Sequence, residues 1–171
     1  MPNWCMNSVT IKGNPDKLKA ILEAANNEAM LQHMVPMPKE LEDTTSPSEG
    51  MNWYSWRLEH WGTKWDAGEV YADIEGDTMT LSFDTAWGPP TDAYDNYTAA
   101  NDDMTIEATY YEPGMCFIGR YDSSEELDES FEVDFGDEDW RDDIPQDLID
   151  DWDLDSEYEN WKEWQEDDED D

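Results

Sequence analysis

The stretch that decides the fold is EVYADIEGDTMTLSFDTAW, residues 69–87. Its two halves, 69–74 and 78–84, are rich in β-forming residues, and Gly76 and Asp77 between them form a sequence typical of a tight turn. The stretch therefore predicts two antiparallel strands joined as a hairpin. The residues that follow, 87–91, contain Gly88 and two prolines and end the second strand.

A strand and a helix are predicted before this hairpin. Residues 7–12 alternate, with Val9 and Ile11 on one side and polar residues on the other. Asn14 is suited to cap a helix that begins at Pro15, because proline is favoured at the first helical position. The apolar residues of that helix recur at helical spacing and are Leu18, Ile21, Leu22 and Ala25. The helix therefore buries one face.

The remaining elements complete an α+β pattern. Residues 34–47 are rich in turns and predict a long loop, 51–61 a short helix, and 92–101 a helix capped by Thr91. Strands are predicted at 105–111 and 115–121, with a further edge strand at 130–135. This order predicts a ferredoxin-like sandwich over residues 1–121, with an antiparallel or mixed sheet and helices on one face.

The charge of the chain restricts its partners. The net charge is −37, and residues 121–171 hold 26 acidic and two basic residues against 20 and seven in residues 1–120. Such a charge excludes direct binding of nucleic acid or an anionic membrane and favours a basic protein surface. A homodimer stays open. The absence of a signal-like start and of an apolar span, with two distant cysteines, predicts a cytoplasmic location and free thiols.

The residues after 121 form an acidic extension. We expect 122–165 to be partly helical and docked on the domain, because aromatic residues are interleaved with the acids, and 166–171 to be a disordered acidic tail. The acids predicted to form a partner-binding surface are Asp137, Glu138, Asp139, Asp142, Asp143, Asp147, Asp150, Asp151, Asp153, Asp155, Glu157, Glu159 and Glu163. The aromatic residues predicted as exposed contacts are Trp61, Trp65, Trp161 and Trp164. Trp53, Trp56 and Trp87 are expected to fill the core of the domain.

Four motifs carry a resemblance to a known family. They lie at 3–7 (NWCMN), 61–65 (WGTKW), 83–90 (FDTAWGPP) and 110–115 (YYEPGM). Over residues 3–121 the chain resembles the YubB-like family of phage, prophage and plasmid proteins, which carry a ferredoxin-like domain. The resemblance implies that fold and a mobile-element setting, so the predicted cytoplasm is that of a host bacterial cell. It implies no activity and no catalytic residue.

No pattern of an enzyme or a metal site stands out. The two histidines, His33 and His60, are interpreted as structural or surface residues, and no nucleophile elbow, zinc motif or phosphate loop occurs. Asp151, Asp153 and Asp155 begin like a calcium loop, but the glycine and the final glutamate that such a loop needs are absent, which leaves at most weak binding of divalent cations. The sequence predicts no catalytic residue, no cofactor and no metal site.

Two functions compete. In the first, carboxylates on a folded surface imitate DNA phosphates, and the protein binds and inhibits a nucleic-acid-binding or defence protein of the host, of the restriction or CRISPR type. The 24 net charges of residues 121–171 correspond to about 40 Å of duplex, since DNA carries one charge per ~1.7 Å. In the second, the protein is a general protein-interaction module of phage or plasmid biology without DNA mimicry. It then binds its partner through tryptophans and depends little on salt.

Overall fold

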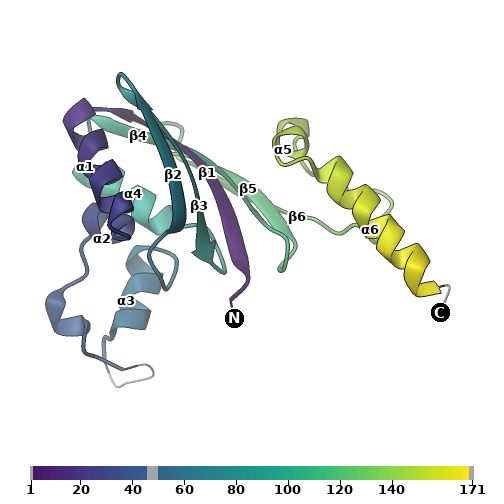
Figure 1. Cartoon of the computed structure of the whole chain (residues 1–171), viewed down its shortest axis with the longest axis horizontal. Helices are drawn as coiled ribbons and strands as arrows, with labels where there is room; N and C mark the ends of the chain where they lie inside the picture. The colour runs from purple at the N-terminus through teal and green to yellow at the C-terminus, as the bar shows by residue number, and fades with distance from the viewer. Residues whose placement is uncertain (1, 46–49, 170–171) are drawn as a thin grey trace.

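The structure, a computed structural model, describes residues 2–45 and 50–169, with side chains up to Asp167. Figure 1 shows one layer of strands between two unequal groups of helices. The helices and strands, in chain order, are β1 (Trp4–Gly13), α1 (Pro15–Asn26), α2 (Met30–Met34), the 3-10 helix η1 (Lys39–Leu41), α3 (Trp53–His60), β2 (Gly68–Glu75), β3 (Thr78–Ala86), α4 (Thr91–Ala100), β4 (Met104–Glu112), β5 (Phe117–Asp122), β6 (Leu127–Glu132), α5 (Gln146–Asp151) and α6 (Leu154–Glu169).

The sheet has six strands in the order β2-β3-β1-β4-β5-β6, and every neighbouring pair is antiparallel. The four strands β2-β3-β1-β4, with α1 after β1 and α4 after β3, have the connectivity of a ferredoxin-like fold. This confirms the predicted α+β class. The hairpin of β5 and β6 extends the sheet beyond β4, so β2 and β6 are its two edges.

One face of the sheet carries the main core. Alternate side chains of β1, β3 and β4 point towards α1, α2, α3 and α4, because successive residues of a strand face opposite sides. Leu18 and Ile21 of α1 are fully buried there, and the side chain of Asn14 caps the helix by accepting hydrogen bonds from the N–H groups of Asp16 (2.9 Å) and Lys17 (3.4 Å). The predicted cap and apolar face of this helix are confirmed.

A second core lies on the opposite face, where β4, β5 and β6 meet the C-terminal segment. Tyr111 and Ile118 are opposite each other in the sheet and pack with Leu148, Ile149 and Leu154 of the C-terminal helices. The extension is therefore docked and partly helical, and the fold has helices on both faces instead of one. Both groups of helices are visible in Figure 1, with α1 to α4 on the left and α5 and α6 on the right.

Three predicted boundaries differ from the structure. Residue 121 lies inside β5, and β6 completes the same sheet, so the domain does not end at 121. The edge strand is 127–132 instead of 130–135. Helix α6 continues to Glu169, so residues 166–169 are helical where a disordered tail was predicted; residues 170–171 lie outside the described residues. The predicted loop at 34–47 contains η1, and its residues 46 and 47 are not described.

Candidate functional site: the acidic C-terminal surface

Rings hold the C-terminal segment together. Phe135 and Trp140 pack edge to face, with ring centroids 5.0 Å apart, and both rings contact Tyr158 of α6, at 5.7 and 5.5 Å. Trp161 stacks on Tyr158 at 6.1 Å. We call Phe135, Trp140, Tyr158 and Trp161 the ring cluster. Because aromatic pairs of this geometry add to the energy of burial, the ring cluster fixes α6 against the loop before α5.

The C-terminal helices are joined to the sheet by contacts outside the ring cluster. Trp152, between α5 and α6, lies 6.1 Å from Tyr111 of β4. The pKa of Tyr111 is raised to about 12 by burial and, to a smaller extent, by the carboxylate of Glu157 on α6. Side chains of the C-terminal helices thus lie against β4, although β5 and β6 separate these parts in the sequence.

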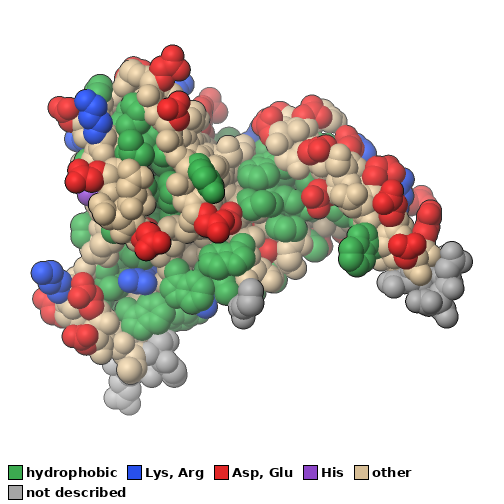
Figure 2. Space-filling view, viewed as in Figure 1, with side chains coloured by type: hydrophobic (Ala, Val, Ile, Leu, Met, Phe, Trp, Pro, Cys, Tyr) green, Lys and Arg blue, Asp and Glu red, His purple; other side chains and the backbone are tan. Residues whose placement is uncertain are grey.

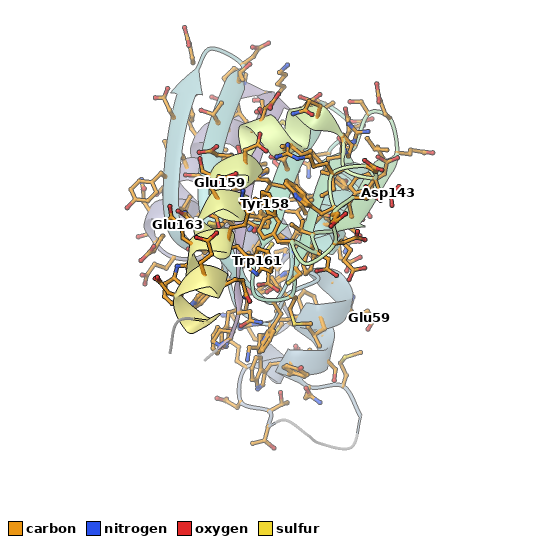
Figure 3. All side chains as sticks on the ribbon, turned by 90° about the vertical axis from the view of Figure 1, so that its right-hand side faces the viewer. Glu59, Asp143, Tyr158, Glu159, Trp161 and Glu163 are labelled. Carbon is orange, nitrogen blue, oxygen red and sulfur yellow. The ribbon has the colours of Figure 1, made fainter. Side chains whose placement is uncertain are left out.

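The carboxylates predicted as a partner-binding surface lie on the outside of this segment. All thirteen are exposed except Asp155, which is half-buried and paired with Arg141. Figure 2 shows acidic side chains distributed along the C-terminal helices. In Figure 3, Glu159 and Glu163 lie along one flank of α6, whereas Tyr158 and Trp161 lie towards the middle and Asp143 at the far side. The structure therefore brings these acids together on one folded unit.

Few of these carboxylates have a cationic partner. Asp147 lies 3.7 Å from Arg120 of β5, and Glu159 lies 2.9 Å from Lys162, which also places its ammonium group over the Tyr158 ring. Asp155 is paired with Arg141. Within residues 2–45 and 50–167, these three are the ion pairs that the thirteen acids form. The other ten present unpaired negative charge to solvent.

The predicted aromatic contacts divide into three groups. Trp61 is fully buried, not exposed: its Nε1–H donates to the carbonyl of Val35 at 2.8 Å, and its ring lies edge-on to Trp56. Trp65 is 39% exposed and Trp164 is 75% exposed, in agreement with the prediction. Trp161 is half-buried in the ring cluster.

A tryptophan surface lies on a different part of the molecule. Trp4, Trp65 and Trp87 are partly exposed, and the rings of Trp4 and Trp65 are 6.1 Å apart. Lys64 places its ammonium group 4.3 Å from the centre of the Trp65 ring. We call Trp4, Trp65 and Trp87 the tryptophan surface. Figure 2 shows apolar side chains in a band from α3 towards the N-terminus. Sequence reasoning assigned Trp87 to the core and did not consider Trp4.

Other classes of site are not apparent in the described part of the chain. Within residues 2–45 and 50–167 no three His, Cys, Asp or Glu side chains are placed to hold a metal ion. Cys5 and Cys116 are both free thiols. Every helix of the described residues is too short or too polar to cross a lipid bilayer.

Comparisons with known proteins identify the fold family. The model of the family described as the ferredoxin-like domain in Api92-like protein matches residues 60–170. One similar solved structure is the crystal structure of the protein api92 from Yersinia pseudotuberculosis, with a TM-score of 0.45 and 20% identity over 61% of this chain and 39% of that chain. The chain thus spans well under half of that protein. No curated protein matches.

The family match covers well over half of the chain and includes β2 to β6 with both C-terminal helices. The relation to YubB-like proteins and the setting of phages and plasmids stay predictions. The chain belongs to the family of Api92-like proteins that carry this ferredoxin-like domain.

Proposed function

We propose that this protein is a non-enzymatic inhibitor from a mobile element, whose C-terminal acidic surface occupies the basic groove of a nucleic-acid-binding protein of the host in place of DNA. The observation that carries the proposal is the attachment of α5 and α6 to the sheet through the second core and the ring cluster. Restriction and CRISPR-type defence proteins are the partner class that this proposal favours, with the bacterial cytoplasm as the place of action.

Attachment matters because a flexible acidic tail loses conformational entropy when it binds. Side chains that are already positioned avoid part of this cost, about 0.5–1.5 kcal/mol for each long side chain that binding would otherwise immobilise. Leu148 and Ile149 of α5 and Leu154 of α6 are fully buried, so the helices that carry the acids are packed against the rest of the fold. The carboxylates are therefore attached to a folded support before a partner arrives.

The spacing of charge along α6 supports the proposal. The helix has 16 residues and therefore spans about 24 Å, at ~1.5 Å for each residue. Its sequence contains eight acids and one lysine, Lys162, so it carries one net negative charge for about 3.4 Å of length. One strand of a DNA duplex carries one phosphate for the same ~3.4 Å. A groove that follows one DNA strand thus meets a similar line density of charge on α6.

A competition experiment tests the proposal. A restriction endonuclease and a CRISPR effector complex are each loaded with a fluorescent DNA duplex, and the full-length protein is added at low and at moderate salt. We expect displacement of the duplex from at least one of them, weakening steeply with salt, since contacts of this kind depend on counterion release. Failure to displace DNA from either at low salt contradicts the proposal for these two partner classes.

Matched variants separate specific from general charge effects. Glu157→Gln, Glu159→Gln and Glu163→Gln together remove three charges from α6. Glu23→Gln, Glu28→Gln and Glu59→Gln remove three exposed charges from the other side of the fold, and Figure 3 shows Glu59 on α3. We expect the α6 variant to displace DNA about tenfold less well, at ~0.5 kcal/mol for each charge, and the control to resemble the wild type. Equal losses in both variants mean that position is irrelevant and contradict mimicry.

The tryptophan surface favours a second function, a protein-interaction module without mimicry. Exposed tryptophans are common at the centre of protein interfaces. In this case Trp65→Ala weakens partner binding, the α6 variant does not, and salt has little effect.

A further inference from the structure

The sheet has an open face over β2, β3, β1 and the first part of β4. The register places Tyr71 opposite Ser82, Ser82 opposite Ser8, and Ser8 opposite Thr109. These side chains point away from α1 to α4, because the residues between them in each strand form the main core. The middle of this face therefore has a floor of small hydroxyl side chains.

A groove of about 650 Å³ runs over this floor. Tyr71 and Glu69 of β2, together with Asp84 of β3, form one side, and Asp151 and Trp152 at the end of α5 form the other. Figure 1 shows α5 beside this face of the sheet. The volume is typical of ligand sites in proteins. The C-terminal segment thus creates a groove that the sheet alone does not have.

The charge of the groove is entirely negative. Its lining residues include the three carboxylates of Glu69, Asp84 and Asp151 and no lysine or arginine. Burial, and secondly the carboxylate of Glu69, raise the pKa of Asp84. The negative charges of Glu69 and Asp84 therefore repel each other. A cation placed here relieves that repulsion.

An adjoining hollow of about 460 Å³ continues the groove towards β5 and shares Ser8, Thr109 and Asp151 with it. It adds the carboxylates of Glu107, Asp122 and Glu125 and one cation, Arg120. Arg120 is already engaged, since it lies 3.1 Å from Glu129 and 3.7 Å from Asp147. The charge available to an occupant therefore stays negative along the whole length.

We propose that this groove binds an arginine-containing, extended segment of the protein partner. A guanidinium group stacks on aromatic rings and forms two parallel hydrogen bonds with a carboxylate, and the groove offers rings and carboxylates on both sides. Charge complementarity thus selects a basic occupant, and the two rings select arginine over lysine.

The size of the groove limits the segment. From β2 to β4 the floor crosses three strand spacings, about 14 Å at ~4.8 Å each. An extended chain of four or five residues covers that distance at ~3.3 Å for each residue. Arginines two residues apart point to the same side, so one guanidinium reaches Tyr71 while the other reaches Trp152. The class of partner in this inference rests on the proposed function, because basic grooves for nucleic acid are rich in arginine. The preference for arginine itself follows from the rings and carboxylates of the groove.

The experiment uses the full-length protein labelled with ¹⁵N and two blocked peptides, Ser-Arg-Ser-Arg-Ser and its lysine counterpart. We expect the arginine peptide to shift the amide signals of Ser8, Ser82 and Thr109 and to bind about fivefold more tightly than the lysine peptide, because only a guanidinium group is planar and pairs with a carboxylate through two hydrogen bonds. Tyr71→Ala tests the stacking at a side chain that is 73% exposed, so the fold is retained. It should reduce this preference for arginine, because the ring of Trp152 and the carboxylates remain in the groove.

Two substitutions that each remove one charge test the position. Asp84 lines the groove, whereas Asp73 lies on the same face of neighbouring β2 outside it. We expect Asp84→Asn to weaken binding of the arginine peptide about fivefold and Asp73→Asn to leave it nearly unchanged. Equal effects of the two substitutions, equal affinity for both peptides, or shifts confined to α6 would each overturn the inference.

The α6 variant separates this inference from the proposed function. Glu157, Glu159 and Glu163 do not belong to the side of the groove that Asp151 and Trp152 form, so their neutralisation should leave the peptide titration unchanged. Peptide binding in the groove without displacement of DNA supports the groove and contradicts mimicry. If the protein displaces DNA but does not bind the arginine peptide, mimicry is supported and the inference about the groove is wrong.

Discussion

Replacement of Trp140 by alanine should detach α6 from the rest of the molecule. The side chain is only 6% exposed and contacts both Phe135 and Tyr158, and the guanidinium group of Arg141 lies 4.5 Å from the centre of its ring. Truncation of a buried tryptophan costs about 3–5 kcal/mol. Leu148 and Ile149 still hold α5 on the sheet, so we expect this cost to appear as local opening of residues 134–145 and of α6, not as global unfolding.

Hydrogen exchange measured by mass spectrometry checks this expectation. A loss of about 3 kcal/mol corresponds to about a hundredfold increase in opening, because 1.4 kcal/mol is a factor of ten. Amides of α6 should lose this protection while those of β1 and β3 keep theirs. Trp164→Ala is the control, since its side chain is 75% exposed and its truncation should change protection little. Unchanged exchange of α6 in the Trp140 variant would refute the role of the ring cluster and remove the main support for mimicry.

Two further predictions concern stability. Asp66→Ala should lower the free energy of unfolding, measured by urea denaturation, by about 2–4 kcal/mol. The reason is that the carboxylate accepts hydrogen bonds from the N–H groups of Leu31 (2.8 Å) and Gln32 (3.0 Å) at the start of α2. Asp73→Ala, at an exposed position, is its control. Burial raises the pKa of Asp66, against these hydrogen bonds, and burial with Glu69 raises that of Asp84. Above about pH 3.9, the ordinary pKa of an aspartate, these two carboxyl groups therefore bind more protons in the folded state than in the unfolded state. The free energy of unfolding then decreases as the pH rises above that value and increases on acidification. Urea denaturation at pH 7 and pH 5 and constant ionic strength should give the larger free energy of unfolding at pH 5, and a smaller one contradicts the assignment.

Local signals account for the parts of the fold that were predicted from sequence. Strand alternation at Val9 and Ile11, the Asn14 cap and the turn at Gly76 all act within a few residues, and all are confirmed. Helix α2 was missed because the cap of its first N–H groups comes from Asp66, 35 residues away from Leu31. Thr91 is the first residue of α4, and no side chain caps that helix, so the predicted cap is wrong.

The candidate site was predictable in composition but not in geometry. Interleaved rings and acids indicated a docked extension, and the acids are exposed as expected. The ion pair of Arg120 with Asp147 depends on how β5 meets α5, which no spacing in the sequence reveals. Trp61 was misassigned because it is buried among residues that are distant in the sequence, as its hydrogen bond to Val35, 26 residues away, shows. The groove is formed by β2, β3, β1, β4 and α5 together, and no single segment signals it.

The two edges of the sheet bear on how copies of this protein behave towards each other. β2 and β6 each have one side without a strand neighbour in the described structure, which elsewhere invites strands of another molecule to add on. Here one edge carries Glu69, Asp73 and Glu75, and the other carries Asp128, Glu129 and Glu132. A second copy that approaches either edge meets like charge, so the sheet is protected against growing into ribbons at high concentration in the cell.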